Sequence, residues 1–288
     1  MFRAALVVML LGSVALAEPT LPPKTIMRWQ TLPPPSAMPA AAATGEVETG
    51  GAKIHYAWYG LDGAPTVILL HGGLGNSDHW ANQVPALGAK YHVLAIDSRA
   101  QGRSTRGDLK LHMSYDLMAK DVIAVMDKLA IKRASIVGWS DGGEVALKLG
   151  IAFPDRVGKL FVFGANYNDD GSKPRGDRTP TFIEYSARCK SQFATLSPDK
   201  RPWATAVDQV RPLWRDPIGI TKGQLKAIAA PVMMADGDHD EVIVIDQEKE
   251  MAKLIPHGQM HVFENASHFT LWQDPDDFNA VVLDFLKD

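Results

Sequence analysis

Three side chains in this sequence have the types and the chain order needed for nucleophilic catalysis: Ser140, Asp240 and His268. A serine hydroxyl is a weak nucleophile at neutral pH and needs a base within hydrogen-bonding distance. A histidine is the usual base, and a carboxylate holds its imidazole in one tautomer and stabilises the imidazolium that forms. The chemistry open to such a set is acyl transfer to the serine oxygen.

Ser140 lies in a short segment whose composition predicts a very tight turn. The apolar residues 134–137 predict a buried strand, and a helical pattern begins at Glu144. Gly138 and Gly142 stand two positions to either side of the serine, where only glycine-sized residues let a strand and a helix approach so closely. A chance Gly-x-Ser-x-Gly in a loop is the alternative. The position between a strand and a helix favours a nucleophile exposed at the carboxyl end of the strand.

The carboxylate partner must come from a loop that contains three aspartates, Asp236, Asp238 and Asp240. This loop follows an apolar run over residues 231–235, which predicts another strand. We predict Asp240 as the acid because it stands three residues beyond Gly237, far enough for the chain to curl back over the sheet edge. A metal site in this acidic cluster is the competing hypothesis. The histidine and carboxylate spacings match no metal signature, so we expect no metal and no other cofactor.

His268 is the predicted base because, of nine histidines, it alone follows the final predicted strand, residues 259–263. Loops that follow parallel strands lie at the same edge of a sheet. Ser140, Asp240 and His268 are therefore expected to meet at that edge. His239, which neighbours the predicted acid, is the alternative base.

A glycine-rich loop, His71-Gly72-Gly73-Leu74-Gly75, directly follows the apolar run over residues 66–70. Glycines let backbone N–H groups approach a substrate closely, as an oxyanion hole requires. A loop that serves only as a turn is the alternative. A dinucleotide site is disfavoured because the third glycine and the acidic residue after it are missing. His71 is expected to brace this loop.

The elements that must position these residues alternate along the chain. A hairpin around Gly50-Gly51 comes first, and apolar strand patterns then alternate with amphipathic helical ones, such as a helix that begins after Ser114 as N-cap. Short loops join these units, which predicts an α/β fold with a parallel sheet covered by helices on both faces. The predicted strands cover residues 46–49, 53–59, 66–70, 92–96, 133–137, 159–163, 231–235 and 259–263.

The alternation breaks after Asn166 and resumes only after Ala227. The intervening segment holds several prolines, two helical patterns over residues 181–196 and 202–214, and a group of aromatic side chains. A long aromatic insertion between sheet strands is typical of a cap over an active site. We predict such a cap over about residues 169–227, and a surface excursion that packs on itself is the alternative.

The first 17 residues have the pattern of a signal peptide: a basic residue, Arg3, then an apolar run, then an Ala-x-Ala cleavage site that ends at Ala17. The apolar run is shorter than the roughly 20 residues that span a bilayer, although an uncleaved anchor is the alternative. We expect a periplasmic or secreted protein. Residues 18–44 are rich in proline and alanine and predict an extended or disordered leader, and residues 45–288 the folded domain.

Composition excludes several classes of partner. The 288 residues include 30 Lys and Arg and 33 Asp and Glu, which gives a net charge of −3. No basic run exceeds two residues, which argues against a surface for nucleic acid or anionic membranes. The single cysteine, Cys189, cannot form an internal disulfide and is expected to be structural. The expected partner is a small-molecule substrate.

In their order along the chain, these motifs resemble those of the α/β-hydrolase superfamily over roughly residues 45–288. His71-Gly72-Gly73 resembles the family's oxyanion loop, and Gly138-x-Ser140-x-Gly142 resembles its nucleophile elbow. Gly237-Asp238-His239-Asp240 resembles its acid loop, and His268 resembles its base. Asp97-x-Arg99-x-x-Gly102-x-Ser104 resembles its Asp-x-Arg-Gly-x-Gly-x-Ser loop, with Ala100 in place of the usual glycine. The resemblance implies a mostly parallel eight-stranded sheet with helices on both faces and a small helical cap.

The resemblance also implies roles for residues beside the nucleophile. The backbone N–H groups of Gly73 and Asp141 would form the oxyanion hole. The Gly-Trp-Ser-Asp-Gly-Gly elbow is similar to that of enzymes resembling valacyclovir hydrolase, in which the acid after the nucleophile helps to recognise an amino group. Asp141 would then favour α-amino esters, and the alternative is that its carboxylate only favours the start of a helix. Trp139 and Leu74 are expected to contact the substrate as well.

A serine at the nucleophile position, where epoxide- and halide-removing members of the superfamily carry aspartate, points to acyl transfer. We therefore predict an exported serine hydrolase that cleaves carboxylic esters of small or medium size through an acyl-enzyme. Alternatives on the same triad are a C–C bond or lactone hydrolase and a cofactor-free perhydrolase. A ligand-binding protein that has lost its chemistry is disfavoured because all three triad residues are present.

Overall fold

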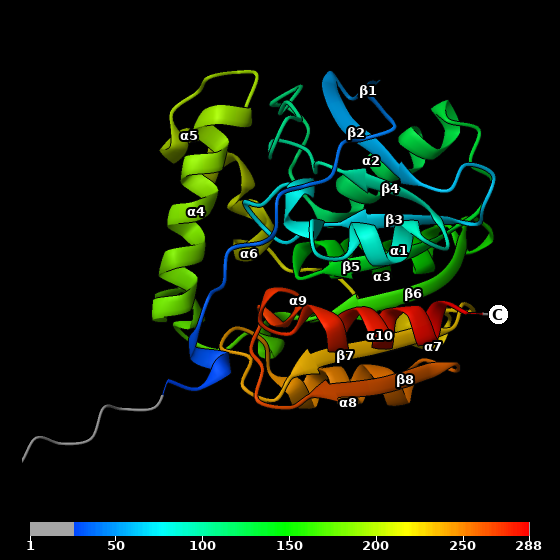
Figure 1. Ribbon diagram of the computed structural model, residues 1–288, viewed down its shortest axis with the longest axis vertical. Helices are drawn as coiled ribbons and strands as arrows, with labels where there is room; N and C mark the ends of the chain where they lie inside the picture. Colours follow the sequence, from blue (N-terminus) through cyan, green and yellow to red (C-terminus); the bar gives the residue numbers. More distant parts are fainter. Residues whose placement is uncertain (1–25, 288) are drawn as a thin grey trace, which may run out of the picture.

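The computed structural model describes residues 26–287, so the predicted signal peptide, residues 1–17, lies outside the described residues. In the described part, eight strands form one sheet in the order β1-β2-β4-β3-β5-β6-β7-β8 (Figure 1). β2 is antiparallel to both β1 and β4, and the other neighbouring pairs are parallel. The α/β class and the mostly parallel sheet are thus confirmed. The strands are β1 (Ala43–Thr49), β2 (Ala52–Gly60), β3 (Thr66–Leu70), β4 (His92–Ile96), β5 (Ala134–Trp139), β6 (Val157–Phe163), β7 (Val232–Gly237) and β8 (Gly258–Phe263).

Helices cover both faces of this sheet (Figure 1). One face carries α2 (Tyr115–Lys128), α3 (Asp141–Ala152), α7 (Lys222–Lys226) and α8 (Ile245–Leu254), and the other carries α1 (Val84–Gly88), α9 (Thr270–Gln273) and α10 (Pro275–Leu286). Single 3-10 turns complete the list: η1 (Arg28–Gln30), η2 (Ser77–Trp80), η3 (Pro154–Arg156), η4 (Asp169–Gly171) and η5 (Gly176–Arg178). Ser114 caps α2 as predicted, since its side chain accepts a hydrogen bond from the N–H of Leu117.

The central strands are apolar along their whole length because each of their faces is buried under a different layer of helices. In β3, Ile68 and Leu70 pack into the core beneath α2 and α3, whereas Val67 and Leu69 pack into the core beneath α1 and α10. Successive side chains of a strand point to opposite faces, so a strand between two helical layers needs no polar positions. This double burial explains why the strand pattern was continuous rather than alternating.

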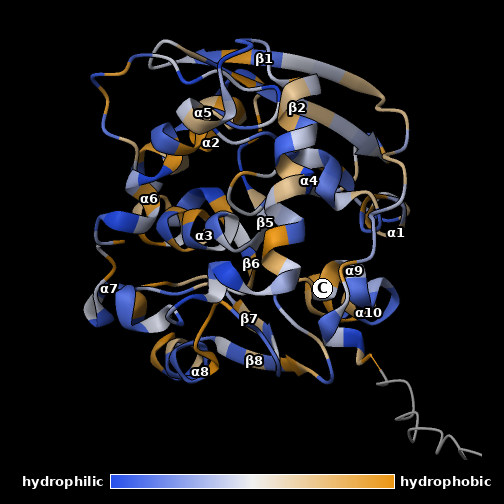
Figure 2. Cartoon of the chain, turned by 90° about the vertical axis from the view of Figure 1, so that its left-hand side faces the viewer, coloured by the Kyte–Doolittle hydropathy of each residue, from blue (hydrophilic) through white to orange (hydrophobic). Residues whose placement is uncertain are grey.

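The predicted cap is present as α4 (Pro180–Leu196), α5 (Trp203–Val210) and α6 (Pro212–Arg215). These three helices lie on one side of the molecule in Figure 1, and that side faces the viewer in Figure 2. The single helix expected over residues 202–214 is instead two. Pro212 has no N–H to continue the hydrogen bonding of α5, so a new short helix starts at that residue.

The segment over residues 26–42 precedes β1, is extended apart from η1, and lies along the domain surface beside α4 (Figure 1). The guanidinium group of Arg28 forms a salt bridge with Asp274 at the start of α10. Further along, Leu32 is buried, and its carbonyl accepts a hydrogen bond of 2.9 Å from Arg188 of α4. The segment therefore contacts both the cap and the region that follows β8.

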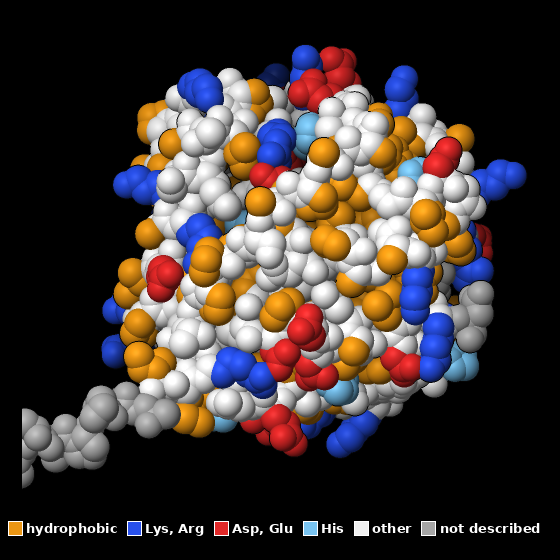
Figure 3. Space-filling model, viewed as in Figure 1, with side chains coloured by type: hydrophobic (Ala, Val, Ile, Leu, Met, Phe, Trp, Pro, Cys, Tyr) orange, Lys and Arg blue, Asp and Glu red, His pale blue; other side chains and the backbone are white. Residues whose placement is uncertain are grey.

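Charged groups of both signs are interspersed over the face of the molecule shown in Figure 3. Within residues 26–287, no helix is long and apolar enough to cross a membrane. Cys189 is buried between the cap and the sheet, and burial raises the pKa of its thiol to about 12. The thiol is thus held in its unreactive protonated form, in agreement with a structural role.

Candidate active site

Ser140 occupies the tight turn predicted between β5 and α3. Its backbone has φ +54° and ψ −124°, in the region of positive φ that only a strained turn imposes on a serine. A Cβ atom on Gly138 would lie 2.2 Å from the carbonyl oxygen of Gly142, and one on Gly142 would lie 2.1 Å from that of Leu70. The two glycines are therefore required by backbone contact, as the sequence predicted.

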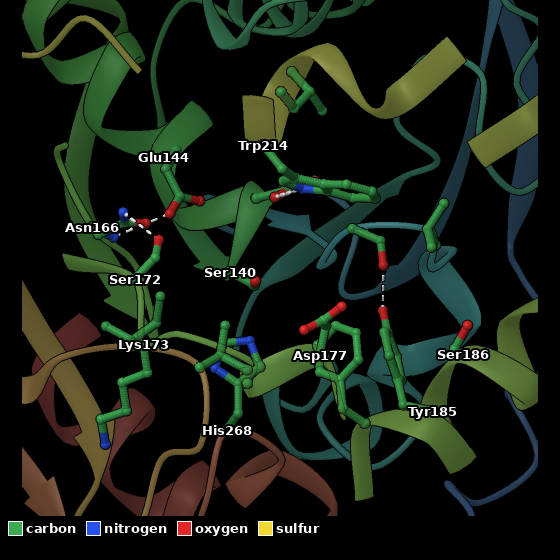
Figure 4. A pocket seen from close by; sticks show the side chains of 18 of the residues that line it. Ser140, Glu144, Asn166, Ser172, Lys173, Asp177, Tyr185, Ser186, Trp214 and His268 are labelled. Atoms are coloured by element: carbon green, nitrogen blue, oxygen red, sulfur yellow. Dashed lines mark hydrogen bonds between the residues drawn. The ribbon is translucent and has the colours of Figure 1, made fainter. Parts of the chain in front are cut away.

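His268 and Asp240 form a buried pair at the same edge of the sheet. The Nδ1 atom of His268 donates to Oδ2 of Asp240 at 2.6 Å, and both side chains are at most 2% exposed. The other carboxylate oxygen, Oδ1, accepts from the backbone N–H groups of Val242 (2.6 Å) and Ile243 (2.7 Å). With Nδ1 bound, Nε2 is left for the cavity, which is lined by both Ser140 and His268 (Figure 4).

The alternatives for acid and base lie elsewhere. Asp238 is partly exposed and accepts from the N–H of Ala266 at 3.1 Å, and its other contact is the ring of His239 at 2.7 Å. That ring also stacks on Trp29 at 4.7 Å, so His239 belongs to the surface. Asp236 is fully buried in β7 behind the pair. Of the three aspartates in this loop, Asp240 is the one whose carboxylate bonds to His268.

The charges around the pair favour proton uptake by the imidazole. Burial alone would lower the pKa of His268, but Asp240, Glu241 and Asp141 outweigh it and raise the pKa above 6.5. Burial alone would raise the pKa of Asp240, but the charge and hydrogen bond of His268 hold it below 3.8. An ionised carboxylate thus faces an imidazole that is more basic than usual, which is the arrangement required of a general base.

The glycine loop is held in place from two sides. Nε2 of His71 accepts from the N–H of Ser98 at 2.9 Å, so Nδ1 carries the proton and donates to the carbonyl of Gly72 at 2.8 Å. His71 thus braces the loop as predicted. From the cap, the hydroxyl of Tyr185 donates to the carbonyl of Gly73 at 2.6 Å. Holding this carbonyl fixes the peptide planes of the loop beside Ser140.

Asp141 binds two side chains that sequence patterns did not identify. The hydroxyl of Tyr115 donates to Oδ1 at 3.0 Å, and the indole N–H of Trp214 in α6 reaches Oδ1 at 3.0 Å and Oδ2 at 3.2 Å. Burial raises the pKa of Asp141, and these two neutral donors oppose that effect. The carboxylate next to the nucleophile therefore already has donors from this chain, and it fastens the cap to the elbow.

A cavity of about 570 Å³ lies between the elbow and the cap, a size that suits a small or medium ligand. Figure 4 shows Ser140 and His268 among the side chains that line it. Apolar lining residues include Leu74, Phe182, Ile183, Leu213, Trp214 and Ile218. Polar ones include Glu144, Asn166, Ser172, Lys173 and Asp177. The carboxyl of Glu144, on the first turn of α3, accepts from the N–H of Asn166 at 3.0 Å.

The other two predicted substrate contacts differ in how they meet the cavity. Leu74 is half-buried, has a φ of +62° and borders the cavity directly. Trp139 also borders it but is only 1% exposed, and its indole N–H donates to the carbonyl of His268 at 2.9 Å. The larger part of Trp139 therefore supports the loop of His268, and contact of either residue with substrate stays a prediction.

A family model described as "Alpha/beta hydrolase family" matches residues 67–281, a span that includes the glycine loop, the elbow, Asp240 and His268. The chain belongs to the alpha/beta hydrolase family. This assignment confirms the resemblance drawn from the motifs and makes the chain a hydrolase by family.

The names of proteins that are similar in sequence or structure refer to different substrates. The chain is 28% identical over 265 residues to "2-hydroxy-6-oxononadienedioate/2-hydroxy-6-oxononatrienedioate hydrolase 2" of Pseudomonas putida, which covers 82% of this chain and 92% of that protein. It is 27% identical to "Serine hydrolase BPHL" of Homo sapiens, over 88% of this chain and 91% of that protein. The solved structure described as "Est816 as an N-Acyl homoserine lactone degrading enzyme" is 25% identical, with a TM-score of 0.70 over 84% of this chain and all of that one.

One departure from the family's pattern is visible in the backbone of this hydrolase. Ala100 stands where the family's loop usually has glycine, and it adopts a φ of +65°, which glycine would adopt without steric cost. The loop is held nonetheless by Arg99, whose buried guanidinium forms a salt bridge with Asp121 and donates to the carbonyl of Thr49 at 2.9 Å. Arg99 thus ties this loop to the first hairpin.

Proposed function

We propose that this hydrolase cleaves uncharged carboxylic esters of small or medium size through an acyl-enzyme on Ser140. The observation that carries the proposal is the bond of 2.6 Å between His268 and Asp240, at the cavity into which the strained elbow exposes Ser140. A nucleophile, a base and a group that orients the base are the minimum set for acyl transfer. The elbow, the glycine loop and the cap all converge on this set.

In the proposed mechanism, Nε2 of His268 takes the proton of Ser140 as Oγ attacks the ester carbonyl. Asp240 keeps the Nδ1 proton in place and stabilises the imidazolium. His268 then gives its proton to the leaving alcohol, and the acyl group stays on Ser140. Water, deprotonated by the same imidazole, releases the acid and restores the serine.

The oxyanion of each tetrahedral intermediate would accept hydrogen bonds from the backbone N–H groups of Gly73 and Asp141. Asp141 is the first residue of α3, so its N–H has no carbonyl to bond within the helix. The helix dipole adds a partial positive charge at the same place. Such donors each contribute roughly 10²–10³ in rate in related chemistry.

The charges around the cavity favour an uncharged substrate. Asp141 and Glu144 lie on the first turn of α3 beside Ser140, and both are buried. The two basic side chains that border the cavity are engaged elsewhere: Lys173 donates to the carbonyl of Asp240 at 2.5 Å, and Arg211 pairs with Asp208. An anionic substrate would thus meet buried carboxyl groups whose pKa values burial already raises, while Arg211 is paired and Lys173 is held at a backbone carbonyl, which is unfavourable in a buried site.

This charge pattern helps to choose among the activities that the names of similar proteins suggest. A dienedioate, the substrate class in the Pseudomonas putida name, carries two carboxylates and fits this cavity poorly. An acyl homoserine lactone, the class in the Est816 description, is an uncharged cyclic ester and fits better. Recognition of an amino group by Asp141 is less favoured, because Tyr115 and Trp214 already donate to its carboxylate.

The proposal is tested with two esters of similar length, one ending in a methyl group and the other in a carboxylate. We expect kcat/KM for p-nitrophenyl butyrate to exceed that for mono-p-nitrophenyl succinate by about tenfold or more, since like charges across a buried contact cost several kcal/mol. Release of nitrophenolate measures both reactions. A preference for the succinate would overturn the argument from charge. The panel also includes N-butyryl homoserine lactone and ethyl 2-aminobutyrate. Failure to cleave any of these esters would overturn the ester proposal, and the formation of peracids would then be assayed instead.

Export is the second part of the proposal, and it rests on the signal-peptide pattern that ends at Ala17. Expression of the full chain in a bacterial host should yield a mature protein in the periplasm or the medium that begins at Glu18. Amino-terminal sequencing of that protein measures the cleavage site. Recovery of the whole chain with Met1 intact from the cytoplasmic fraction would contradict export.

A further inference from the structure

Three carboxyl groups, rather than one, lie behind the imidazole of His268. Asp236 is at the carboxyl end of β7, Asp240 follows in the next loop, and Glu248 is on the first turns of α8. Their exposures are 0%, 2% and 0%. The mechanism above uses only Asp240, so the other two have no role in it. Burying two further carboxyl groups is costly unless each has a hydrogen-bonding partner.

The backbone satisfies only half of each extra carboxyl group. One oxygen of Asp236 accepts from the N–H of Gly237 at 2.8 Å, and one oxygen of Glu248 accepts from the N–H of Ala165 at 2.9 Å. No donor in the described residues reaches Oδ2 of Asp236 or Oε2 of Glu248. Yet Asp236 lies within hydrogen-bonding contact of both Asp240 and Glu248. A carboxylate cannot donate, so these contacts are hydrogen bonds only if a carboxyl group carries a proton.

The charged groups around the cluster do not neutralise the carboxyl groups of Asp236 and Glu248. Lys173 reaches only the backbone carbonyl of Asp240, at 2.5 Å, and Glu241 uses its carboxylate to accept from the N–H of His268 at 3.1 Å. From α3, the acidic Asp141 and Glu144 face the same region. The acidic groups that face the cluster are thus Asp141, Glu144 and Glu241, and the basic ones are His268 and Lys173. In residues 26–287, no group of three or more His, Cys, Asp or Glu is arranged to hold a metal ion.

Protons are therefore the available means of neutralising the two extra groups. Burial first, and the negative charge of Asp240 second, raise the pKa of Asp236 well above 3.8. Burial likewise raises the pKa of Glu248 well above 4.5. Asp240 differs because His268 holds its pKa low. These opposite pKa directions favour one anion and two neutral acids, as expected when like charges share a buried site.

We infer that Asp236 is a positioning residue for the triad: it stays protonated, donates its O–H to the carboxylate of Asp240, and is supported from behind by the protonated carboxyl of Glu248. This inference rests on the proposed function, in which Asp240 orients His268. A donor from Asp236 fixes the orientation of the Asp240 carboxylate and delocalises its charge. It thereby limits how strongly Asp240 holds a proton on His268.

The pH dependence of turnover reports this effect. His268 acts as a base only when neutral, so kcat/KM rises with pH through the pKa of His268. Asp236→Asn keeps a neutral N–H donor and should leave that acidic limb within about 0.3 pH unit of the wild type. Asp236→Val removes the donor at similar volume, makes Asp240 more basic, and should move the limb to higher pH by about one unit. Glu248→Gln also keeps a neutral donor and should behave as Asp236→Asn does.

Opposite shifts separate this proposal from its rivals. If Asp236 were ionised, Asp236→Asn would remove a negative charge near the imidazolium and move the limb to lower pH. If Asp236 only filled space, neither variant would move the limb, although stability would change. Either result overturns the proposal. Asp238→Asn is the matched control, since Asp238 is two residues away and partly exposed, and its limb should coincide with that of the wild type.

A second readout does not depend on turnover at all. In protein with 13C-labelled aspartate carboxyls, one resonance at pH 7 should have the chemical shift of a protonated acid and should vanish in Asp236→Asn. Its absence from the wild-type spectrum would overturn the proposal even if esters are cleaved. If the wild type cleaves no ester but this resonance is present, the proposed function fails while the protonated state of Asp236 stands. Circular dichroism of each variant verifies the fold.

Discussion

Replacement of Ser140 with alanine is expected to lower ester turnover by a factor on the order of 10⁵–10⁶. The variant keeps the cavity, the base and the backbone donors but has no oxygen to accept the acyl group. In serine hydrolases in general, loss of the nucleophile alone costs about as much as loss of the whole triad, and the donors and binding leave a small residual rate. Hydrolysis of p-nitrophenyl butyrate measures the change.

The same variant also separates an enzyme from a binding protein on this fold. Wild-type protein should be labelled by a fluorophosphonate at Ser140, and Ser140→Ala should not be labelled. Ser191→Ala, which changes an exposed serine of α4, is the matched control and should retain both activity and labelling. Equal turnover by wild type and Ser140→Ala would refute the assignment of the nucleophile. Absence of labelling in the wild type would favour a protein that has lost its chemistry.

The elbow could be predicted because its causes are local in sequence. A run of apolar residues, two glycines at fixed spacing and a helical pattern together specify a strand, a tight turn and a helix. Physical contact between the backbones at Gly138 and Gly142 then leaves few other conformations. The continuous apolar pattern of β3 likewise required a sheet that is covered on both faces. These predictions needed no knowledge of distant parts of the chain.

Contacts between the cap and the elbow could not be predicted in this way. Trp214 is 73 positions from the carboxylate of Asp141 that it bonds, and Tyr115 is 26 positions away in another helix. Such pairs depend on how the cap sits on the sheet, which periodicity does not encode. The break between α5 and α6 could have been predicted from Pro212, because a proline inside a helical pattern ends or kinks the helix. Asp141 was thus recognised as unusual, but its partners were not.

The acid loop lies between these extremes. Spacing was enough to favour Asp240 over its neighbours, yet the burial of Asp236 and its contact with Glu248 depend on the helix that follows the loop. The position of Asp236 at the end of an apolar strand could have indicated a buried carboxyl group, and a buried carboxyl group needs a hydrogen-bonding partner. The partner itself, 12 positions away on α8, could be identified only from the fold.

Replacement of Asp240 with asparagine is expected to lower kcat/KM for p-nitrophenyl butyrate by about 10⁴-fold. The amide retains the shape of the carboxylate, but it does not hold the proton on Nδ1 of His268 or stabilise the imidazolium as an anion does. The acidic limb of the remaining rate should move to lower pH, because the pKa of His268 is no longer raised by Asp240. At alkaline pH the remaining rate should rise further than that of the wild type, because hydroxide can substitute for the base.

Asp238→Asn is the decisive comparison for Asp240→Asn, because both changes remove one carboxylate from the same loop. Asp238 contacts His239 and the N–H of Ala266, whereas Asp240 contacts His268, so the two variants should differ by three orders of magnitude or more in rate. A large loss in Asp238→Asn with a small one in Asp240→Asn would transfer the role of acid to Asp238. A loss in neither would mean that the buried bond of His268 orients a side chain that takes no part in the chemistry.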